Sequence, residues 1–273
     1  MKEVVPQTET GKIVRKTALP VGEYFETVID APVAAGKARP GQFVHIRLRG
    51  NSDPLLRRPF SIAGAENGKL TILFKKVGRM TAEFAEMKDG AELDVLGPLG
   101  HGYDLTRKTG NAFLVAGGYG IAPLLFLARA IREKKLAPKI ILIEGARTAA
   151  HLVWADKAQA ESAWLEFIAA TEDGTAGKKG NAVEALAEAM KGKEGDSQMF
   201  ACGPMGMLGA MHKRWPGVPF QCAVENQMGC GMGLCQGCIL PLVPKAGQPL
   251  YTRICHDGPV YDGNAIDWDK CPK

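Results

Sequence analysis

The sequence lacks any apolar run near the roughly 20 residues that a helix needs to cross a bilayer. The longest candidate, Ile121–Ala130, is interrupted by Pro123 and carries Arg129. The opening residues, MKEVVPQTET, contain no apolar signal segment. We therefore expect a protein with no membrane span that stays in the cytoplasm.

The sequence also lacks a basic tract with interleaved aromatic residues, and its net charge of +5 is spread along the chain. Nucleic acid is therefore a poor candidate partner. No internal repeat or low-complexity segment is present. Hydrophobic residues make up 46% of the chain and charged residues 23%, as in an ordinary globular protein. The length of 273 residues allows two domains with a small third.

Four of the seven cysteines lie near the C-terminus with a distinctive spacing. Cys230, Cys235 and Cys238 read C-x4-C-x2-C, and Cys255 follows after a gap. Plant-type 2Fe–2S clusters use this spacing, in which four thiolates hold two irons. The intervening glycines allow the backbone to wrap tightly and to direct amide N–H groups at the sulfurs. The sequence thus predicts a 2Fe–2S site and single-electron transfer.

Two other interpretations of these cysteines are less favourable. A zinc site usually contains two C-x2-C pairs, whereas this segment has only the pair of Cys235 and Cys238. A disulfide framework requires an oxidising compartment and is usual in small domains. Both the spacing and the length of the chain therefore favour iron.

The first hundred residues show short β-rich runs separated by glycine and proline turns, which is typical of a small antiparallel barrel. One helix is expected near Met80–Met87. The expected strands are Lys12–Thr17, Tyr24–Asp30, Gln42–Leu48, Phe60–Ala63, Lys69–Lys76 and Glu92–Leu96.

After Gly110, apolar runs of strand length alternate with helical stretches, which indicates βαβ units and a parallel sheet. We expect strands at Ala112–Ala116, Ile140–Glu144, Trp164–Ala170 and Gln198–Cys202, and helices at Ile121–Lys134, Ala182–Met190 and Met205–Lys213. The predicted fold is an antiparallel β-barrel (1–105), a doubly wound parallel α/β domain (106–217) and a small C-terminal iron–sulfur module (218–273).

A glycine turn, Gly117-Gly118-Tyr119-Gly120, joins the first α/β strand to its helix. Backbone N–H groups and the helix dipole favour phosphate at such a place. The G-x-G-x-x-G fingerprint of generic dinucleotide-binding folds is absent, so the prediction depends on the βαβ context. Cys202 and Gly203 end a later strand at the same edge of the sheet, where ligands of open α/β sheets bind.

The string Arg57-Arg58-Pro59-Phe60-Ser61 lies on a predicted barrel strand. A guanidinium suits a pyrophosphate because it offers a rigid fork of donors. A serine hydroxyl can donate a hydrogen bond to a ring nitrogen. Taken alone, two arginines on a barrel strand are more often a solvated face.

The order of these motifs resembles that of the ferredoxin–NADP reductase superfamily. The matching motifs are R-P-F-S at 58–61, G-R-M-T at 78–81, G-P-L-G at 97–100, G-G-Y-G-I-A-P at 117–123 and C-G-P-M at 202–205. The C-terminal strings GCGMGLCQGC and ICHDGPVYDG narrow the resemblance to the electron-transfer subunits of class 1B dihydroorotate dehydrogenases. This resemblance implies FAD in the barrel, NAD on the α/β domain and the cluster in the C-terminal module.

The resemblance also implies roles for individual residues. Arg58 would contact the flavin pyrophosphate with Pro59 beside it, and Ser61 would face the reactive edge of the isoalloxazine. Phe60 stands where many relatives have tyrosine, so stacking could persist without a phenol hydrogen bond. Further cofactor-binding residues are expected at Gly78 and Thr81 for FAD and at Gly117, Gly118, Gly120 and Gly203 for NAD.

Cys202 would lie near the nicotinamide and the flavin, but the sequence leaves open whether it is chemically active or only a small buried residue. The choice between NAD and NADP also rests on the resemblance. Glu144 and Arg147, near the end of the second strand, indicate different dinucleotides, because an acid favours NAD and a base favours NADP.

The implied function is a redox relay. A catalytic, FMN-containing partner subunit would oxidise dihydroorotate, and the electrons would pass through the cluster and FAD to NAD. The assembly would be a hetero-oligomer, expected to be a heterotetramer. Flavin subunits of transhydrogenases, sulfur reductases and soluble hydrogenases share the framework and remain the alternative. Some transhydrogenase relatives have aspartate in place of the first cluster cysteine, so Cys230 favours the dihydroorotate type.

Overall fold

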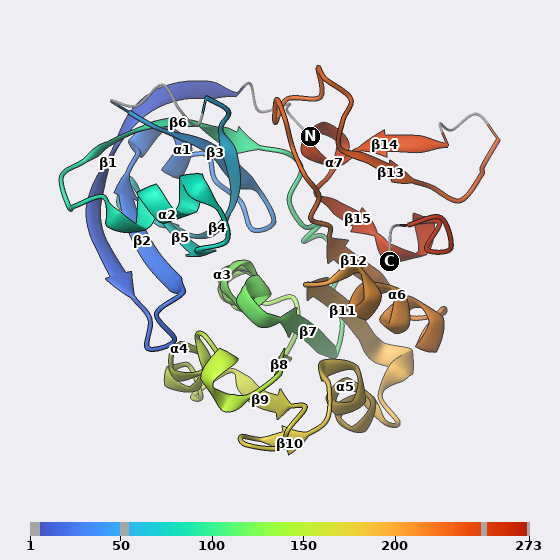
Figure 1. Ribbon diagram of the computed structural model, residues 1–273. Coiled ribbons are helices and arrows are strands. Elements are labelled where there is room, and N and C mark those ends of the chain that lie inside the picture. The colour runs from blue at the N-terminus through green and yellow to red at the C-terminus, as the bar shows by residue number, and fades with distance from the viewer. Residues whose placement is uncertain (1–5, 50–54, 247–249, 272–273) are drawn as a thin grey trace.

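The computed structural model describes residues 6–49, 55–246 and 250–271. Its N-terminal part is a closed antiparallel barrel with the strand order β1-β2-β5-β4-β3-β6 (Figure 1). The strands are β1 (Gln7–Ala18), β2 (Tyr24–Asp30), β3 (Phe43–Leu48), β4 (Arg58–Glu66), β5 (Lys69–Lys75) and β6 (Glu92–Leu99). All six contain a predicted strand or coincide closely with one.

Alternate strand residues such as Ile46, Ile62, Ile72 and Val95 fill the barrel interior, as the period of two in the sequence requires. Helix α2 (Arg79–Glu86) closes one end of the barrel with Phe84, which stacks on Phe74 at 4.7 Å between ring centroids. The short helix α1 (Pro32–Ala35), which we did not predict, follows β2.

The second part is built on a seven-stranded sheet with the order β10-β9-β8-β7-β11-β12-β15. Its pairs are parallel except for the last, β12 with β15, which is antiparallel. The strands are β7 (Asn111–Gly117), β8 (Lys139–Ala146), β9 (Glu166–Thr171), β10 (Lys178–Lys179), β11 (Ser197–Cys202), β12 (Phe220–Ala223) and β15 (Val260–Asp262).

Helices cover both faces of this sheet, which confirms the doubly wound prediction. Along β7, Leu114 faces a core that contains α3 (Ile121–Glu133), whereas Phe113 faces a core that contains α5 (Ala182–Met190). Helix α4 (Ala155–Ala160), which we did not predict, lies on the α3 side, and α6 (Met205–Arg214) lies on the α5 side. Short 3-10 turns occur at Gly118–Gly120, Ala149–His151, Glu194–Asp196 and Gly263–Ala265.

The C-terminal segment, orange to red in Figure 1, lies beside both the barrel and the sheet. It contains the two-stranded sheet of β13 (Ile239–Pro241) and β14 (Tyr251–Arg253), followed by α7 (Ile254–Asp257). Its first and last strands, β12 and β15, complete the large sheet, and Leu240, Ile254 and Ile266 join the core shared with α5 and α6. The boundary at residues 217 and 218 therefore stays a prediction, because the segment is integrated with the sheet.

No helix in the part of the chain that the structure describes is long and apolar enough to cross a membrane.

Candidate functional site

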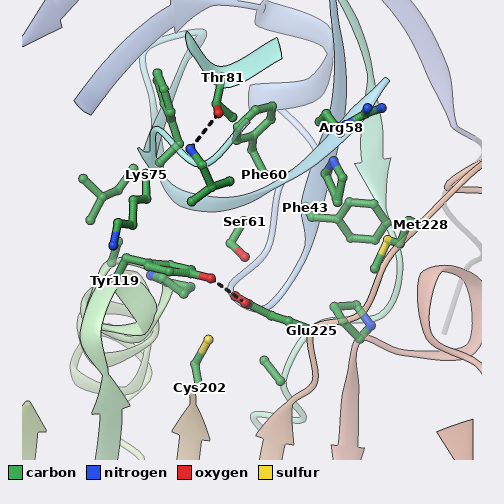
Figure 2. Close-up of a pocket in the computed structure, with 18 of the residues that line it drawn as sticks. Phe43, Arg58, Phe60, Ser61, Lys75, Thr81, Tyr119, Cys202, Glu225 and Met228 are labelled. Atoms are coloured by element: carbon green, nitrogen blue, oxygen red, sulfur yellow. Dashed lines mark hydrogen bonds between the residues drawn. The ribbon is translucent and has the colours of Figure 1, made fainter. Parts of the chain in front are cut away.

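A cavity of about 350 Å³ opens where the barrel, the sheet and the C-terminal segment meet. Figure 2 shows side chains from all three parts pointing into it. Seven of the predicted site residues line it, namely Arg58, Pro59, Phe60, Ser61, Gly78, Thr81 and Cys202. The volume lies within the range of small-molecule sites, about 300–1,000 Å³.

Strand β4 forms the barrel wall of this cavity. Ser61 pairs with Phe43 of β3, so regular strand pairing sets the position of the hydroxyl. Phe60 packs edge-on against Phe74 and Phe84, each at 5.7 Å between ring centroids. Because sheet and core packing both restrain this wall, it offers a rigid aromatic surface with one hydroxyl.

The two adjacent arginines at the start of β4 have different surroundings. Arg58 lines the cavity, and its guanidinium donates to the backbone carbonyls of Leu56 and Arg57 at 3.0 and 3.1 Å. The Arg57 guanidinium instead bonds to Asp94 at 2.6 Å. This contact helps to hold the pKa of Asp94 below its usual value despite the opposing effect of burial. Arg58 is thus the arginine placed for an anion in the cavity.

The N-terminus of α2 also opens into the cavity. The Thr81 hydroxyl accepts hydrogen bonds from the amides of Val77 and Gly78 at 2.9 and 3.0 Å, which shapes the first turn (Figure 2). A Cβ atom on Gly78 would meet no other atom within 4 Å. This free space beside a helix N-terminus and a guanidinium suits a phosphate group. The cradle therefore fits the phosphates of a flavin dinucleotide.

Three groups face one another at the sheet side of the cavity. Cys202 ends β11, and burial raises the pKa of its thiol well above the ordinary value. The Tyr119 hydroxyl donates to the Glu225 carboxylate at 3.0 Å (Figure 2). Glu225 and burial together raise the pKa of Tyr119. Near neutral pH, the cavity thus presents a neutral thiol beside a phenol bonded to a carboxyl group.

Sequence analysis did not single out Tyr119 or Glu225. Many protein atoms lie around the Glu225 carboxyl, and this partial loss of water raises its pKa. The side chain is still exposed to solvent, because it borders the open cavity. The available signal was Phe220–Ala223, a short and mostly apolar segment that forms β12, with an acid just beyond its carboxyl end. Tyr119 lies within the glycine turn, where only the glycines were predicted to contact NAD.

The predicted dinucleotide glycines bring two turns close together at the carboxyl edge of the sheet. A Cβ atom on Gly117 would lie 2.5 Å from Pro204, and one on Gly203 would lie 2.9 Å from the Gly117 nitrogen. A Cβ atom on Gly120 would lie 2.2 Å from the Cys202 carbonyl oxygen. Only Gly118, with a φ of +55°, has open space around it. Close packing accounts for three of these glycines, and their contact with NAD stays a prediction.

The two residues considered for ribose recognition differ in exposure. Glu144 is fully buried and accepts a hydrogen bond from the Val153 amide at 2.9 Å. Burial raises its pKa to about 8. Arg147 is exposed just beyond the end of β8. Glu144 is therefore enclosed beneath the loop that follows β8 and does not face the crevice.

The four predicted cluster ligands gather around one glycine-rich loop. The Gly233 amide donates to the Cys255 sulfur at 3.1 Å, and the Met232 and Cys235 amides donate to the Cys230 sulfur at 3.4 Å. Gly231 and Gly233 have φ values of +73° and +79°. The expectation that glycines direct amides at the sulfurs is met at Gly233, and the left-handed conformation explains why glycine is required.

The thiols form two pairs. Cys230 and Cys235 interact on the outer side of the loop, whereas Cys238 and Cys255 interact in the core. Burial acts to raise the pKa of Cys230, but the amides of Cys235 and Met232 outweigh it and lower the value to about 7. Burial and the neighbouring Cys238 raise the pKa of Cys255 to about 12.

A two-iron cluster takes two protein thiolates at each iron, so paired cysteines match its needs. Within residues 6–49, 55–246 and 250–271, no group of three or more His, Cys, Asp or Glu side chains is placed to hold a single metal ion. All seven cysteines are free thiols, so the disulfide interpretation is wrong for this structure.

His45 of β3 contacts this loop from the barrel and was not noted in the sequence. It is only 1% exposed, and neither ring nitrogen has a hydrogen-bond partner. Burial lowers its pKa to about 4, although the nearby backbone of Cys230 and of Arg57 opposes the shift. The ring is therefore neutral at physiological pH.

The barrel with its phosphate cradle, the doubly wound sheet and the paired thiols together define an iron–sulfur flavoprotein of the NAD-linked reductase class. Residues 225–267 match the family described as the iron–sulfur cluster binding domain of dihydroorotate dehydrogenase B. Residues 114–213 match the oxidoreductase NAD-binding domain.

Curated relatives identify the family. The electron transfer subunit of dihydroorotate dehydrogenase B (NAD(+)) from Geobacillus kaustophilus is 35% identical over 89% of this chain and 92% of its own. The same subunit from Bacillus pumilus is 35% identical over 83% and 85%. The chain belongs to the family of dihydroorotate dehydrogenase B electron transfer subunits. It is an oxidoreductase subunit that uses FAD, NAD and a 2Fe–2S cluster.

Solved structures agree on the fold. The NADH-dependent reduced ferredoxin-NADP oxidoreductase, described for flavin-based electron bifurcation, aligns with a TM-score of 0.82 at 30% identity. That match covers 99% of this chain and 92% of the other. A ferredoxin NADP+ reductase from Neisseria gonorrhoeae with bound FAD and NADP has a TM-score of 0.64 at 18% identity, covering 76% of this chain and 89% of its own. The latter likeness concerns the fold alone.

Proposed function

We propose that this chain passes electrons between NAD and a catalytic partner that oxidises dihydroorotate, as part of pyrimidine biosynthesis. The observation that carries the proposal is the shared cavity. Its lining includes Ser61 of the barrel, Cys202 of the sheet and Met228 of the C-terminal segment. Met228 lies two residues before the first cluster ligand, Cys230, so the flavin cavity and the cluster loop adjoin.

In this proposal the barrel residues bind and orient the flavin. Arg58 and the N-terminus of α2 hold its phosphates, and Gly78 leaves room for them. Phe60 provides an apolar surface, and the Ser61 hydroxyl faces the ring system. Bound FAD supplies the chemistry that joins two-electron exchange with NAD to one-electron exchange with the cluster.

Residues of the sheet position the nicotinamide. The close packing of Gly117 against Pro204 keeps the two turns at the carboxyl edge together. Cys202 contributes as a neutral thiol at the end of β11, because burial holds its pKa high. Its role is to contact and orient the ring, since a thiol whose pKa is raised is a poor nucleophile.

NAD is the proposed dinucleotide, on the strength of the family. The buried Glu144 does not supply an acid for the ribose, and the exposed Arg147 is a base that would suit a 2′-phosphate. Comparing kcat/KM for NADH and NADPH tests the assignment. A strong preference for NADPH would overturn it.

The partner is proposed to dock over the outer side of the cluster loop. Leu234 is 77% exposed there, beside the exposed Cys235. An apolar side chain next to cluster ligands suits a subunit interface through which electrons pass. We propose a heterotetramer with an FMN-containing dehydrogenase subunit, located in the cytoplasm, where the free cysteines stay reduced.

Reconstitution tests the function. The holoprotein alone should reduce an artificial acceptor with NADH but should not oxidise dihydroorotate. Adding a dihydroorotate dehydrogenase catalytic subunit should give dihydroorotate-dependent formation of NADH. A Cys230→Ser variant should keep the first activity and lose the second. If the flavin-loaded chain fails with NADH and every acceptor, the proposal is wrong.

The alternative is a transhydrogenase-type subunit, favoured by the TM-score of 0.82 to the ferredoxin-NADP oxidoreductase. That function predicts electron exchange with reduced ferredoxin and no response to dihydroorotate with any catalytic subunit.

A further inference from the structure

We propose that His45 is a positioning residue for the iron–sulfur cluster, supplying a hydrogen bond from the flavin barrel to the cluster-binding loop and thereby raising the cluster's reduction potential. The proposal depends on the cluster but not on the identity of the partner.

The first observation is direct contact between strand β3 and the loop. A Cβ atom built on Gly231 would lie 2.4 Å from Nδ1 of His45 and 3.0 Å from its Cε1. Gly231 directly follows Cys230, the first cluster ligand. The Nδ1 edge of the imidazole thus faces the ligand loop, with no room for a side chain between them.

The second observation is the unsatisfied polarity of the ring. His45 is 1% exposed and both of its nitrogens lack a partner. A neutral imidazole carries one N–H donor and one acceptor. Because a buried donor left unpaired is destabilising, we infer that the ring donates to an acceptor of the adjoining loop when the cluster is bound. The backbone of Cys230 and that of Arg57 both lie near the ring, and the close approach of Gly231 to Nδ1 puts the cluster loop on the Nδ1 side.

The third observation is the position of β3 between the two redox sites. Phe43, two residues before His45, lines the flavin cavity and pairs with Ser61. His45 itself pairs with Pro59 and with Leu96 on the two neighbouring strands. Because strands β4 and β6 pair with β3 on either side, the backbone of His45 is held firmly, and its imidazole lies between the flavin barrel and the cluster loop.

An N–H dipole directed at the ligand loop stabilises the more negative, reduced cluster, since hydrogen bonds around the sulfurs tune cluster potentials. Removing the donor should therefore lower the midpoint potential. The effect is separate from catalysis and can be measured on the isolated holoprotein.

The test compares His45→Leu with His45→Asn by redox titration monitored through the EPR signal of the reduced cluster. The leucine variant should show a lower midpoint potential, and asparagine, whose amide overlies Nδ1, should restore most of it. His212→Leu is the matched control, because His212 contacts Asn264 and Trp268 instead. Equal potentials for wild type and the leucine variant would overturn the proposal.

Two further outcomes are informative if the leucine variant loses its cluster. If the asparagine variant retains the cluster, the result supports the hydrogen bond. If both variants lose the cluster, the loop needs the shape of the imidazole ring rather than its hydrogen bond, and the proposal is overturned. A double-mutant cycle tests the contact itself. Gly231→Ala should reduce iron per chain, and His45→Ala should recover part of that loss. Absence of any recovery would contradict the contact.

Discussion

The cavity and the cluster loop hold their functional groups in different ways. Ser61 and Cys202 lie on strands whose partners are fixed by regular pairing. Cys230 and Cys235 lie in a stretch of bends with neither helix nor strand between β12 and β13. The cavity is thus organised by the fold, whereas the loop relies on amide–sulfur contacts and on the metal itself.

The same contrast recurs inside the cluster site. Cys238 and Cys255 are 1% and 2% exposed and belong to the core shared with α5 and α6. Cys235 is exposed and Cys230 is half-buried. One side of the site is therefore part of the folded core, and the other depends on the bound cluster.

The largest expected effect comes from replacing one cluster ligand on each side of the site. Cys255→Ser and Cys235→Ser should both lose the cluster, seen as loss of iron and of iron–sulfur absorption. As apoproteins they should differ. Cys255→Ser buries a hydroxyl in the core and should lower stability by about 1–3 kcal/mol, whereas Cys235→Ser should change it by less than about 0.5 kcal/mol. Thermal melts measure the difference, and equal melting temperatures would contradict the division into two sides.

The next largest effect concerns packing at the edge of the sheet. Gly120→Ala places a Cβ atom 2.2 Å from the Cys202 carbonyl oxygen, against backbone that cannot yield. We expect a loss of about 3 kcal/mol, as for severe overpacking, together with weakened NADH binding. Gly206→Ala on α6 is the control, since its Cβ would meet nothing within 4 Å and should gain about 0.5 kcal/mol. Thermal melts measure the stability of both variants, and NADH titration measures their binding. Equal results for the two variants would show that the turn tolerates a side chain at Gly120 and would contradict the prediction.

These regions also differ in how well sequence predicted them. The β-rich run along β2 and the apolar run before Gly117 gave strands close to those observed, because each depends on local pattern. Cysteine spacing identified the cluster loop because ligands must recur at short intervals. By contrast, β12 is only four residues long, and it is a strand because β11 and β15 lie on either side of it. Such long-range pairing has no local signature.

Residues of the candidate site follow the same division. Arg58 and Ser61, which line the cavity, were predicted as site residues because they lie close together in a distinctive string. Glu225 and His45 were missed, because their importance comes from Tyr119 and Gly231, which lie far from them along the chain. Contacts between parts of the fold, rather than motifs, define these two residues.

A third prediction compares pH dependence within the sheet. Glu144 has an ordinary pKa of 4.5 when unfolded and about 8 when folded. Between these values the folded state holds a proton that the unfolded state has lost, so rising pH destabilises the wild type. Relative to Glu144→Gln, the wild type should lose about 3–4 kcal/mol from pH 5 to pH 8 and change little above that. Melting temperatures of both proteins across this range measure it, and parallel curves would exclude a raised pKa.

The smallest expected effect tests the hydrogen bond that joins the two walls of the cavity. Tyr119→Phe keeps the aromatic ring and removes the donor to Glu225, which should lower stability by about 1 kcal/mol. The loss should also raise the pKa of Glu225 further, because that bond opposes the effect of burial. Tyr251→Phe, on the half-exposed face of β14, is the matched control and should melt like wild type. If Tyr119→Phe also melts like wild type, packing alone holds the two walls together. The cavity would then depend on hydrogen bonds even less than the cluster loop, which relies on amide–sulfur contacts.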